Sequence, residues 1–244
     1  TGTTFGIPGV AEFALQMKTI PQARAIRHRL LQTYEEVENG RRPKEALRVV
    51  VVGGGPTGVE LSGAIAELQR AMRREFPDLV DLGSVTLVEA GPRLLPSFSE
   101  KSSEHARHEL EQLDVVVRVD SAVDRMYPTD VHLKSGDVLT AGTMIWAAGV
   151  AAPAEWKDLG VTDRAGRLEV SPTLQLDESI WVIGDIAHVE GAEVRLAAAQ
   201  ELAQKGGSGL LVLHAAASRV AAMDLGFVHA GGLVGALDGA EAVY

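Results

Sequence analysis

The hydrophobic positions in the first fifty residues follow first a helical and then an extended pattern. The helical set is spaced by three or four residues and consists of Ala23, Ile26, Leu30, Tyr34 and Val37. Thr19 is the expected cap of this helix, and Asn39-Gly40 is its expected stop. The run Leu47–Val52 is short, apolar and β-branched, which is typical of a buried parallel strand.

A glycine-rich turn follows that strand and leads into a second helical pattern, expected over Gly58–Met72. Another apolar run, Ser84–Glu89, predicts a second strand. The order of strand, glycine turn, helix and strand indicates a βαβ unit with a parallel strand pair. Because residues 71–83 lengthen the crossover, we expect either an extension of the helix or an excursion of the chain there.

The period of the pattern changes after a third helix. That helix is expected to begin at a capping box of Ser97 and Glu100 and to lead into an extended run over Val115–Val119. Short strands separated by turn residues then predict an antiparallel meander over Ala122–Met126, Val131–Lys134, Val138–Leu139 and Met144–Ala147. A later strand is expected over Ser179–Ile183, and a helix from near Leu196.

Charge and composition narrow the function classes. The 244 residues carry 23 Lys+Arg against 33 Asp+Glu, a formal net charge of -10, and no basic run that would suit a nucleic-acid backbone. The longest uncharged stretch, Val138–Ala154, is shorter than a membrane-spanning helix requires. The sequence has no cysteine, which excludes disulfides and thiolate metal sites within it, and no metal site is predicted. Redox chemistry would therefore need a bound cofactor.

The glycine turn carries the main chemical signal. Gly53, Gly55 and Gly58 fit the pattern GxGxxG between a strand and a helix. Gly53 would allow the tight turn, Gly55 would let a pyrophosphate approach the backbone, and Gly58 would let helix and strand pack closely. Glu89 ends the next strand and is the candidate acceptor for ribose hydroxyls, with Arg93 nearby as a charge that would soften rejection of a 2′-phosphate. The alternative is a glycine-rich turn in an ordinary α/β domain.

Two weaker signals lie further along the chain. Gly184-Asp185 ends a strand, where the acid would bind a cofactor hydroxyl or simply form a helix-capping turn. Gln200 and Gln204 lie one helical turn apart, where their amides would bind a carbonyl-bearing ring or pair with each other. On spacing alone the capping turn is the preferred interpretation of Gly184-Asp185, whereas the spacing of the two glutamines does not decide between their alternatives.

Five segments, taken in order, carry a resemblance to a known family. They are VVVVGGGPTGVELSGAIAEL, LVEAGPRLLP, MIWAAGV, WVIGDIA and AQELAQKG, and the opening residues 1–31 match as well. The chain resembles the type II NADH dehydrogenases, single-subunit flavoproteins that act as NADH:quinone oxidoreductases. The match covers most of residues 1–210.

That resemblance implies an α/β fold of the Rossmann-type flavoprotein class with two dinucleotide-binding domains, the nicotinamide domain being inserted into an FAD domain. We expect residues 47–148 to form the NAD(H)-binding domain. Residues 1–46 would then be an FAD-domain remnant with the connecting helix, and residues 149–244 the C-terminal part of the FAD domain. The implied enzyme passes hydride from NADH to FAD and then reduces a quinone.

Carried over residue by residue, the resemblance assigns three groups of site residues. The NADH group is Gly53, Gly54, Gly55, Pro56, Thr57, Gly58, Glu89, Ala148 and Gly149. The FAD group is Gly184, Asp185, Ala199 and Gln200. The expected catalytic residues near the nicotinamide and the quinone are Glu60, Gln200 and Gln204. For Glu60 the alternative is a first-turn glutamate that complements the helix dipole.

Complete members of that family carry an earlier glycine motif for FAD and a C-terminal amphipathic anchor, and neither is visible in this sequence. We therefore expect a chain that is truncated at both ends. Whether the fragment is active stays open. The expected partners are NADH and a quinone, in the cytoplasm. Homodimerisation and peripheral contact with the inner face of the cell membrane stay open for the intact protein. Two alternatives are a ferredoxin- or rubredoxin-reductase-like flavoprotein and a module that binds NADH without turnover. Disulfide reductases and sulfide:quinone reductases are excluded because they need cysteines.

Overall fold

The computed structural model describes residues 4–79, 83–149, 159–163, 167–184, 187–189 and 211–215. Its contacts divide the chain into two compact units, an N-terminal unit that holds Thr4–Ala148 and a C-terminal unit that holds residues 149–217. Within the described residues, no helix is both long and apolar enough to cross a membrane.

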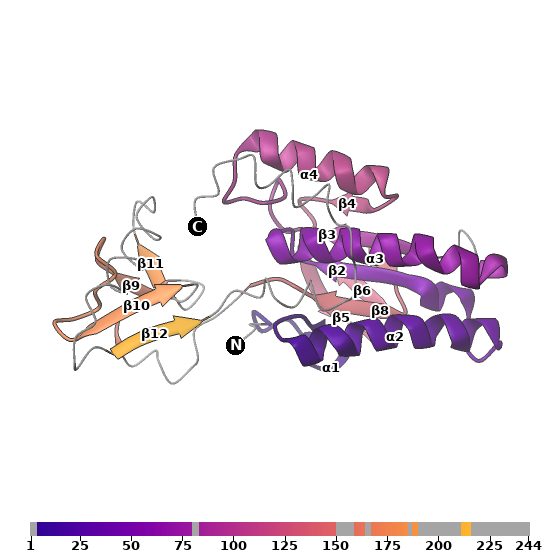
Figure 1. The fold of residues 1–244 in the computed structure, drawn as a ribbon, viewed down its shortest axis with the longest axis horizontal. Helices are drawn as coiled ribbons and strands as arrows, with labels where there is room; N and C mark the ends of the chain where they lie inside the picture. Colours follow the sequence, from indigo (N-terminus) through magenta and orange to yellow (C-terminus); the bar gives the residue numbers. More distant parts are fainter. Residues whose placement is uncertain are drawn as a thin grey trace. The chain divides into compact units, whose positions relative to one another are not determined.

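A five-stranded parallel sheet forms the centre of the N-terminal unit, with the strand order β1-β8-β2-β3-β4 (Figure 1). Its strands are β1 (Leu15–Gln16), β2 (Arg48–Val52), β3 (Ser84–Val88), β4 (Val116–Arg118) and β8 (Thr143–Trp146). Strands β2 and β3 are neighbours, with Val50 opposite Thr86. The predicted βαβ unit and its parallel strand pair are therefore confirmed.

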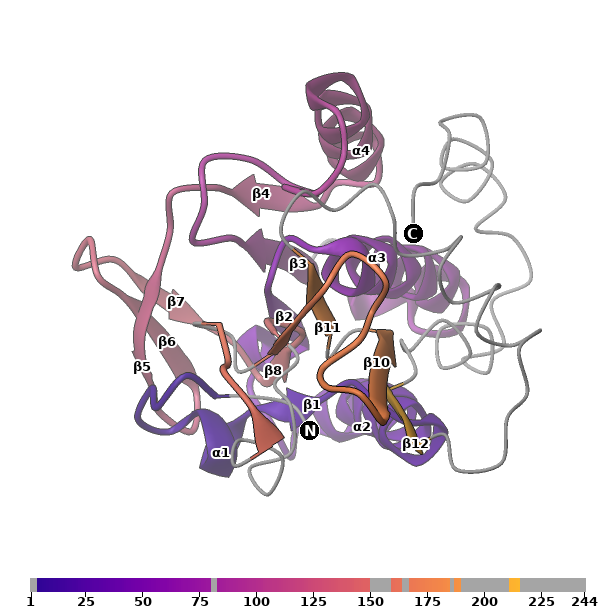
Figure 2. The same cartoon turned by 90° about the vertical axis from the view of Figure 1, so that its left-hand side faces the viewer.

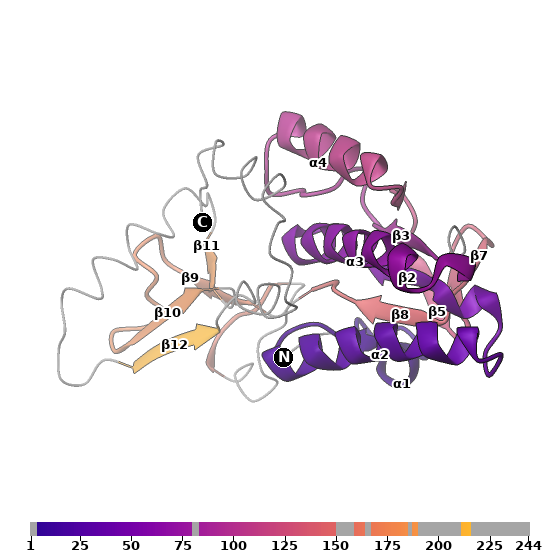
Figure 3. The ribbon, with the colours of Figure 1, turned by 45° about the vertical axis from the view of Figure 1, so that its right-hand side comes forward.

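Helices cover one face of this sheet, and a small antiparallel sheet covers the other (Figure 2). The helices run alongside one another in Figure 3 and are α2 (Ile20–Glu38), α3 (Pro56–Glu75) and α4 (Glu100–Gln112), with the 3₁₀ turn η1 (Lys44–Leu47) before β2. Val49 and Val51 of β2 pack with the helices, whereas Val50 and Val52 pack with the other layer. Burial on both faces explains the continuous apolar run of this strand.

The second layer corrects one part of the sequence-based prediction. It consists of β5 (Val123–Met126), β6 (Asp130–Leu133), β7 (Val138–Thr140) and the short helix α1 (Val10–Phe13). The strand predicted over Met144–Ala147 is present as β8, but its predicted place in the meander is wrong, because β8 lies between β1 and β2 in the parallel sheet. Every residue of β8 is buried, with Ile145 on the helical side and Trp146 on the other. A strand buried on both faces suits the interior of a parallel sheet.

Helix α2 begins and ends as predicted. The Thr19 hydroxyl accepts a hydrogen bond from the Gln22 N–H at 3.4 Å, and the Gln22 side chain accepts one from the Thr19 N–H at 3.1 Å, so the two form a capping box. Asn39 is the C-cap. Helix α3 reaches Glu75 and is followed by the 3₁₀ turn η2 (Pro77–Leu79), which confirms the expected extension of the crossover.

Helix α4 begins two residues later than predicted. Its cap is Ser99, whose hydroxyl accepts a hydrogen bond from the Ser102 N–H at 3.2 Å, and the predicted capping box at Ser97 is wrong. The Phe98 N–H is bonded to the Leu95 carbonyl at 2.9 Å. This turn, Leu95–Phe98, contains Ser97, so the predicted cap residue lies before the helix.

The C-terminal unit contains two parallel strand pairs among its described residues. They are β10 (Ile180–Gly184) with β12 (Leu211–Ala215), and β9 (Leu168–Val170) with β11 (Ala187–Val189). Strand β10 confirms the strand predicted over Ser179–Ile183. The helix expected from near Leu196 lies outside the described residues. The division into a nicotinamide and a flavin domain stays a prediction.

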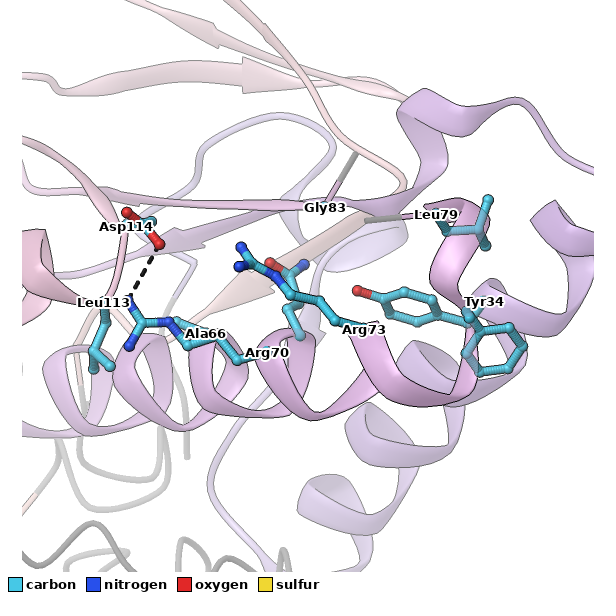
Figure 4. A pocket seen from close by; sticks show the side chains of 10 residues that line it. Tyr34, Ala66, Arg70, Arg73, Leu79, Gly83, Leu113 and Asp114 are labelled. Carbon is cyan, nitrogen blue, oxygen red and sulfur yellow. Dashed lines mark hydrogen bonds and ion pairs between the residues drawn. The ribbon is translucent and has the colours of Figure 1, made fainter. Parts of the chain in front are cut away.

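A cleft lies beside the C-terminal half of α3, and Tyr34 and Arg73 point into it (Figure 4). Gly83, which also lines it, directly precedes β3, so the cleft lies at the amino ends of the strands. Parallel α/β sheets bind their ligands at the opposite, carboxyl ends. Tyr34 is 5% exposed, and its ring centroid lies 5.4 Å from that of Phe76. We therefore assign this region to packing.

Burial raises the pKa of Tyr34 to about 12, against the opposing effect of the Arg73 charge. A phenol whose pKa is raised by folding stabilises the protein below pH 10 and loses that contribution as the pH rises toward 12. We expect the free energy of unfolding to fall by about 1 kcal/mol more in the wild type than in Tyr34→Phe between pH 9 and pH 11. Urea denaturation at both pH values measures it. Tyr127→Phe, at a partly exposed position, should behave like the wild type, and identical losses in wild type and Tyr34→Phe would refute the assignment.

Candidate active site

The glycine turn lies directly after β2, at the carboxyl end of the parallel sheet. Gly53 has φ +116, and its N–H donates to the Val88 carbonyl at 2.8 Å. A Cβ at Gly53 would lie 2.6 Å from the Ala148 nitrogen, and a Cβ at Gly58 would lie 1.7 Å from the Gly53 carbonyl oxygen. Backbone conformation and close packing therefore both require glycine here.

Gly54 is held on both sides by the segment that follows β3. Its N–H donates to Glu89 Oε2 at 2.5 Å, and its carbonyl accepts from the Leu95 N–H at 2.8 Å. A Cβ at Gly54 would meet the Glu89 side chain at 2.9 Å. The close approach of Glu89 to the turn thus depends on the missing side chain at Gly54.

Gly55 caps helix α3 and differs from its neighbours, because a Cβ there would meet nothing within 4 Å. Among the residues that the structure describes, no side chain bonds to the first turn as a cap, and Pro56 and Thr57 begin the helix. The positive end of the α3 dipole therefore faces open space beside Gly55. Such a helix start suits an anion, above all a phosphate group.

The Glu89 carboxylate is fixed by main-chain donors at the end of β3. Besides Gly54, the Gly91 N–H donates to Glu89 Oε1 at 2.7 Å. The Glu89 N–H donates to the Arg118 carbonyl, and its carbonyl accepts from the Ser121 N–H, each at 2.8 Å. A carboxylate offers about four lone-pair sites, so the half-buried Glu89 can accept further hydrogen bonds from hydroxyl groups.

Several predicted site residues gather at this edge of the sheet. The structure brings together Gly53, Gly54, Gly55, Pro56, Thr57, Gly58, Glu89 and Ala148. Gly149, with φ +78, is the residue after Ala148. Glu60 lies beyond the first turn of α3, which contains no acidic residue, so the alternative of a first-turn glutamate is wrong.

The remaining predicted residues belong to the C-terminal unit. Gly184 is the last residue of β10. Asp185, Ala199, Gln200 and Gln204 lie outside the described residues. Their roles stay predictions from the sequence.

Sequence reasoning missed two contributors to the site. Gly91 and Leu95 supply the N–H groups that fix Glu89 and Gly54, and the only signal was their place in the segment EAGPRLLP. Arg93, the predicted charge near the ribose site, donates its guanidinium N–H groups to loop carbonyls, including that of Pro96 at 2.7 Å. Its effect on a 2′-phosphate stays a prediction.

A family model described as pyridine nucleotide-disulphide oxidoreductase matches residues 1–207. The chain belongs to this family. It contains no cysteine within its 244 residues, so the disulphide chemistry in the family's description has no thiol to use in this sequence. The α/β, Rossmann-type fold class predicted from the sequence is confirmed.

Similar proteins agree with the resemblance seen in the sequence. A type II NADH:quinone oxidoreductase of Mycobacterium tuberculosis is 33% identical over 203 residues, 77% of this chain and 44% of its own. A probable mitochondrial NADH-ubiquinone oxidoreductase of Schizosaccharomyces pombe is 32% identical over 222 residues, 83% of this chain and 40% of its own. A solved structure of NDH2 from Plasmodium falciparum in complex with NADH matches with a TM-score of 0.68 and 28% identity, over 78% of this chain and 42% of its own. The chain thus spans less than half the length of these relatives.

Gly58 and Gly55, the last and the middle glycine of the motif, should respond differently to a methyl group. We expect Gly58→Ala to lower the free energy of unfolding by about 3 kcal/mol or more, because its Cβ would overlap the Gly53 carbonyl. Gly55→Ala should stay within about 1 kcal/mol of the wild type, since its φ of -72 suits alanine and its Cβ meets open space. Urea denaturation compares the two. Equal losses would contradict the packing described for this turn.

Proposed function

We propose that the chain is part of an FAD-dependent NADH:quinone oxidoreductase, which passes hydride from NADH to the flavin and then reduces a quinone, and that its residues 47–148 are the nicotinamide-binding domain. The observation that carries this proposal is the Glu89 carboxylate held by the Gly54 N–H beside the open start of α3. An anion-binding helix start and a hydroxyl acceptor lie side by side, as a nucleoside diphosphate requires.

The strand order supports one direction for the bound dinucleotide. Strand β3 carries Glu89 on one side of β2, and strand β8 leads to Ala148 on the other. The adenosine ribose would lie at Glu89 and the pyrophosphate over Gly55. The nicotinamide would then extend toward Ala148, Gly149 and Glu60. Ligands of open parallel sheets lie along the carboxyl ends of their strands in this way.

The flavin and quinone parts of the proposal rest on the sequence and on the relatives. Gly184, Asp185, Ala199 and Gln200 are proposed to hold FAD, which would accept the hydride and pass electrons onward. Gln200 and Gln204 are proposed to donate hydrogen bonds to the carbonyl oxygens of the quinone. The relatives that are NADH-ubiquinone or NADH:quinone oxidoreductases support a quinone as acceptor.

For the intact protein we also propose a peripheral contact with the membrane and a homodimer. A quinone that dissolves in the bilayer has to be reached at the membrane surface, which supports a peripheral contact with the inner face of the cell membrane. A homodimer rests on the resemblance alone.

Glu89 should set the preference for NADH over NADPH. A 2′-phosphate would meet the negative charge of Glu89, so we expect NADPH to give a kcat/KM about 100-fold lower than NADH in quinone reduction by the flavin-loaded protein. Glu89→Gln removes that charge, but its NH2 group takes the place of one of the two carboxylate oxygens and would face the N–H donor of Gly54 or Gly91. For this variant we therefore expect about tenfold weaker NADH binding and a smaller ratio of NADH to NADPH affinity.

The matched control is Glu104→Gln, an exposed carboxylate on α4 that should leave both nucleotides unaffected. Dissociation constants of NADH and NADPH for this chain, measured by fluorescence titration, separate binding from turnover. Equal affinities for the two nucleotides in the wild type would overturn the assignment of Glu89. Absence of NADH binding altogether would overturn the proposed function.

A further inference from the structure

The loop after β3 closes around the side chain of Arg93. The guanidinium donates to the carbonyls of Phe98 at 2.9 Å, Pro96 at 2.7 Å and Leu95 at 3.4 Å. Carbonyl groups in a loop need such partners, and one planar cation with several donors satisfies three of them together.

This loop also holds the turn that fixes Glu89. Leu95 has φ +48, a left-handed conformation that a branched residue adopts only when its surroundings impose it. In that conformation its N–H donates to the Gly54 carbonyl, while its side chain is 1% exposed in the helical-side core. The same Gly54 peptide segment donates its N–H to Glu89. Arg93, Leu95, Gly54 and Glu89 therefore form one connected chain of hydrogen bonds.

Neighbouring elements fix the rest of the loop. The Leu94 carbonyl accepts from the buried Ser103 hydroxyl of α4 at 2.7 Å, and the Gly91 carbonyl accepts from the Asp120 N–H at 2.8 Å. The Arg93 guanidinium holds the second half of the loop together, because it bonds to the carbonyls of Leu95, Pro96 and Phe98.

We propose that Arg93 is a positioning residue that sets nucleotide selectivity through Leu95 and Gly54. By holding the Leu95 N–H on Gly54 it keeps the Glu89 carboxylate at the ribose end of the site. This inference rests on the proposed NADH site, in which Arg93 itself touches no part of the nucleotide.

The test compares Arg93→Met with Arg107→Met in the full chain. Arg107 of α4 lines, together with Arg93, a groove between the loop and α4, but it pairs with Glu111 at 2.8 Å and makes none of the loop bonds described above. We expect Arg93→Met to weaken binding of ADP-ribose about tenfold and to reduce the ratio of NADH to NADPH affinity, because a displaced Glu89 no longer repels the 2′-phosphate. Arg107→Met should match the wild type in both.

The ratio of NADH to NADPH affinity distinguishes a positioning role from a general loosening of the fold. General loosening would weaken the binding of both nucleotides equally and leave the ratio unchanged. An unchanged ratio in Arg93→Met, or wild-type affinity for ADP-ribose, would overturn the inference while leaving the proposed function in place. Failure of the wild type to bind ADP-ribose would overturn both. If Arg93→Met does not fold, Arg93→Lys serves instead, since a flexible ammonium keeps the charge without the planar fork. The same fall in the ratio is then expected, and wild-type values would refute the role.

Discussion

The hydrogen bond between the Gly54 N–H and Glu89 Oε2 is the interaction on which the site depends. It joins the ends of β2 and β3, which are far apart in the sequence but adjacent in the sheet. The bond can form only because Gly54 has no side chain and because Gly53 turns with φ +116 immediately before it. The glycines therefore give the turn its shape, and the turn fixes the Glu89 carboxylate.

The parallel sheet explains how the Gly54 N–H and the Glu89 carboxylate are brought to the site. Strand β2 is buried on both faces, so its carboxyl end is held rigidly between β8 and β3. In the proposed complex, one dinucleotide would extend across the ends of these three strands. Gly58 allows α3 to lie close to the turn, which brings the positive helix start to the pyrophosphate position.

Patterns that depend on local periodicity could be predicted from the sequence, and arrangements that depend on distant contacts could not. The βαβ unit and the Thr19 cap follow from short-range signals. The place of β8 is set by tertiary contacts, because a short apolar strand has the same sequence pattern in a meander as in the interior of a sheet. The turn before Ser99 and the bonds of Arg93 arise from loop geometry, which carries no period. Glu89 could be proposed from its motif, whereas its Gly91 donor required coordinates.

Amide chemical-shift mapping of this chain during titration with NADH tests the central claim most directly, because it locates the nucleotide on the molecule. The account predicts that the largest changes occur at Gly54, Gly55 and Gly91, with little change at Gly83 in the cleft beside Tyr34. Changes concentrated at Gly83 and Tyr34, with the glycine turn unaffected, would contradict it.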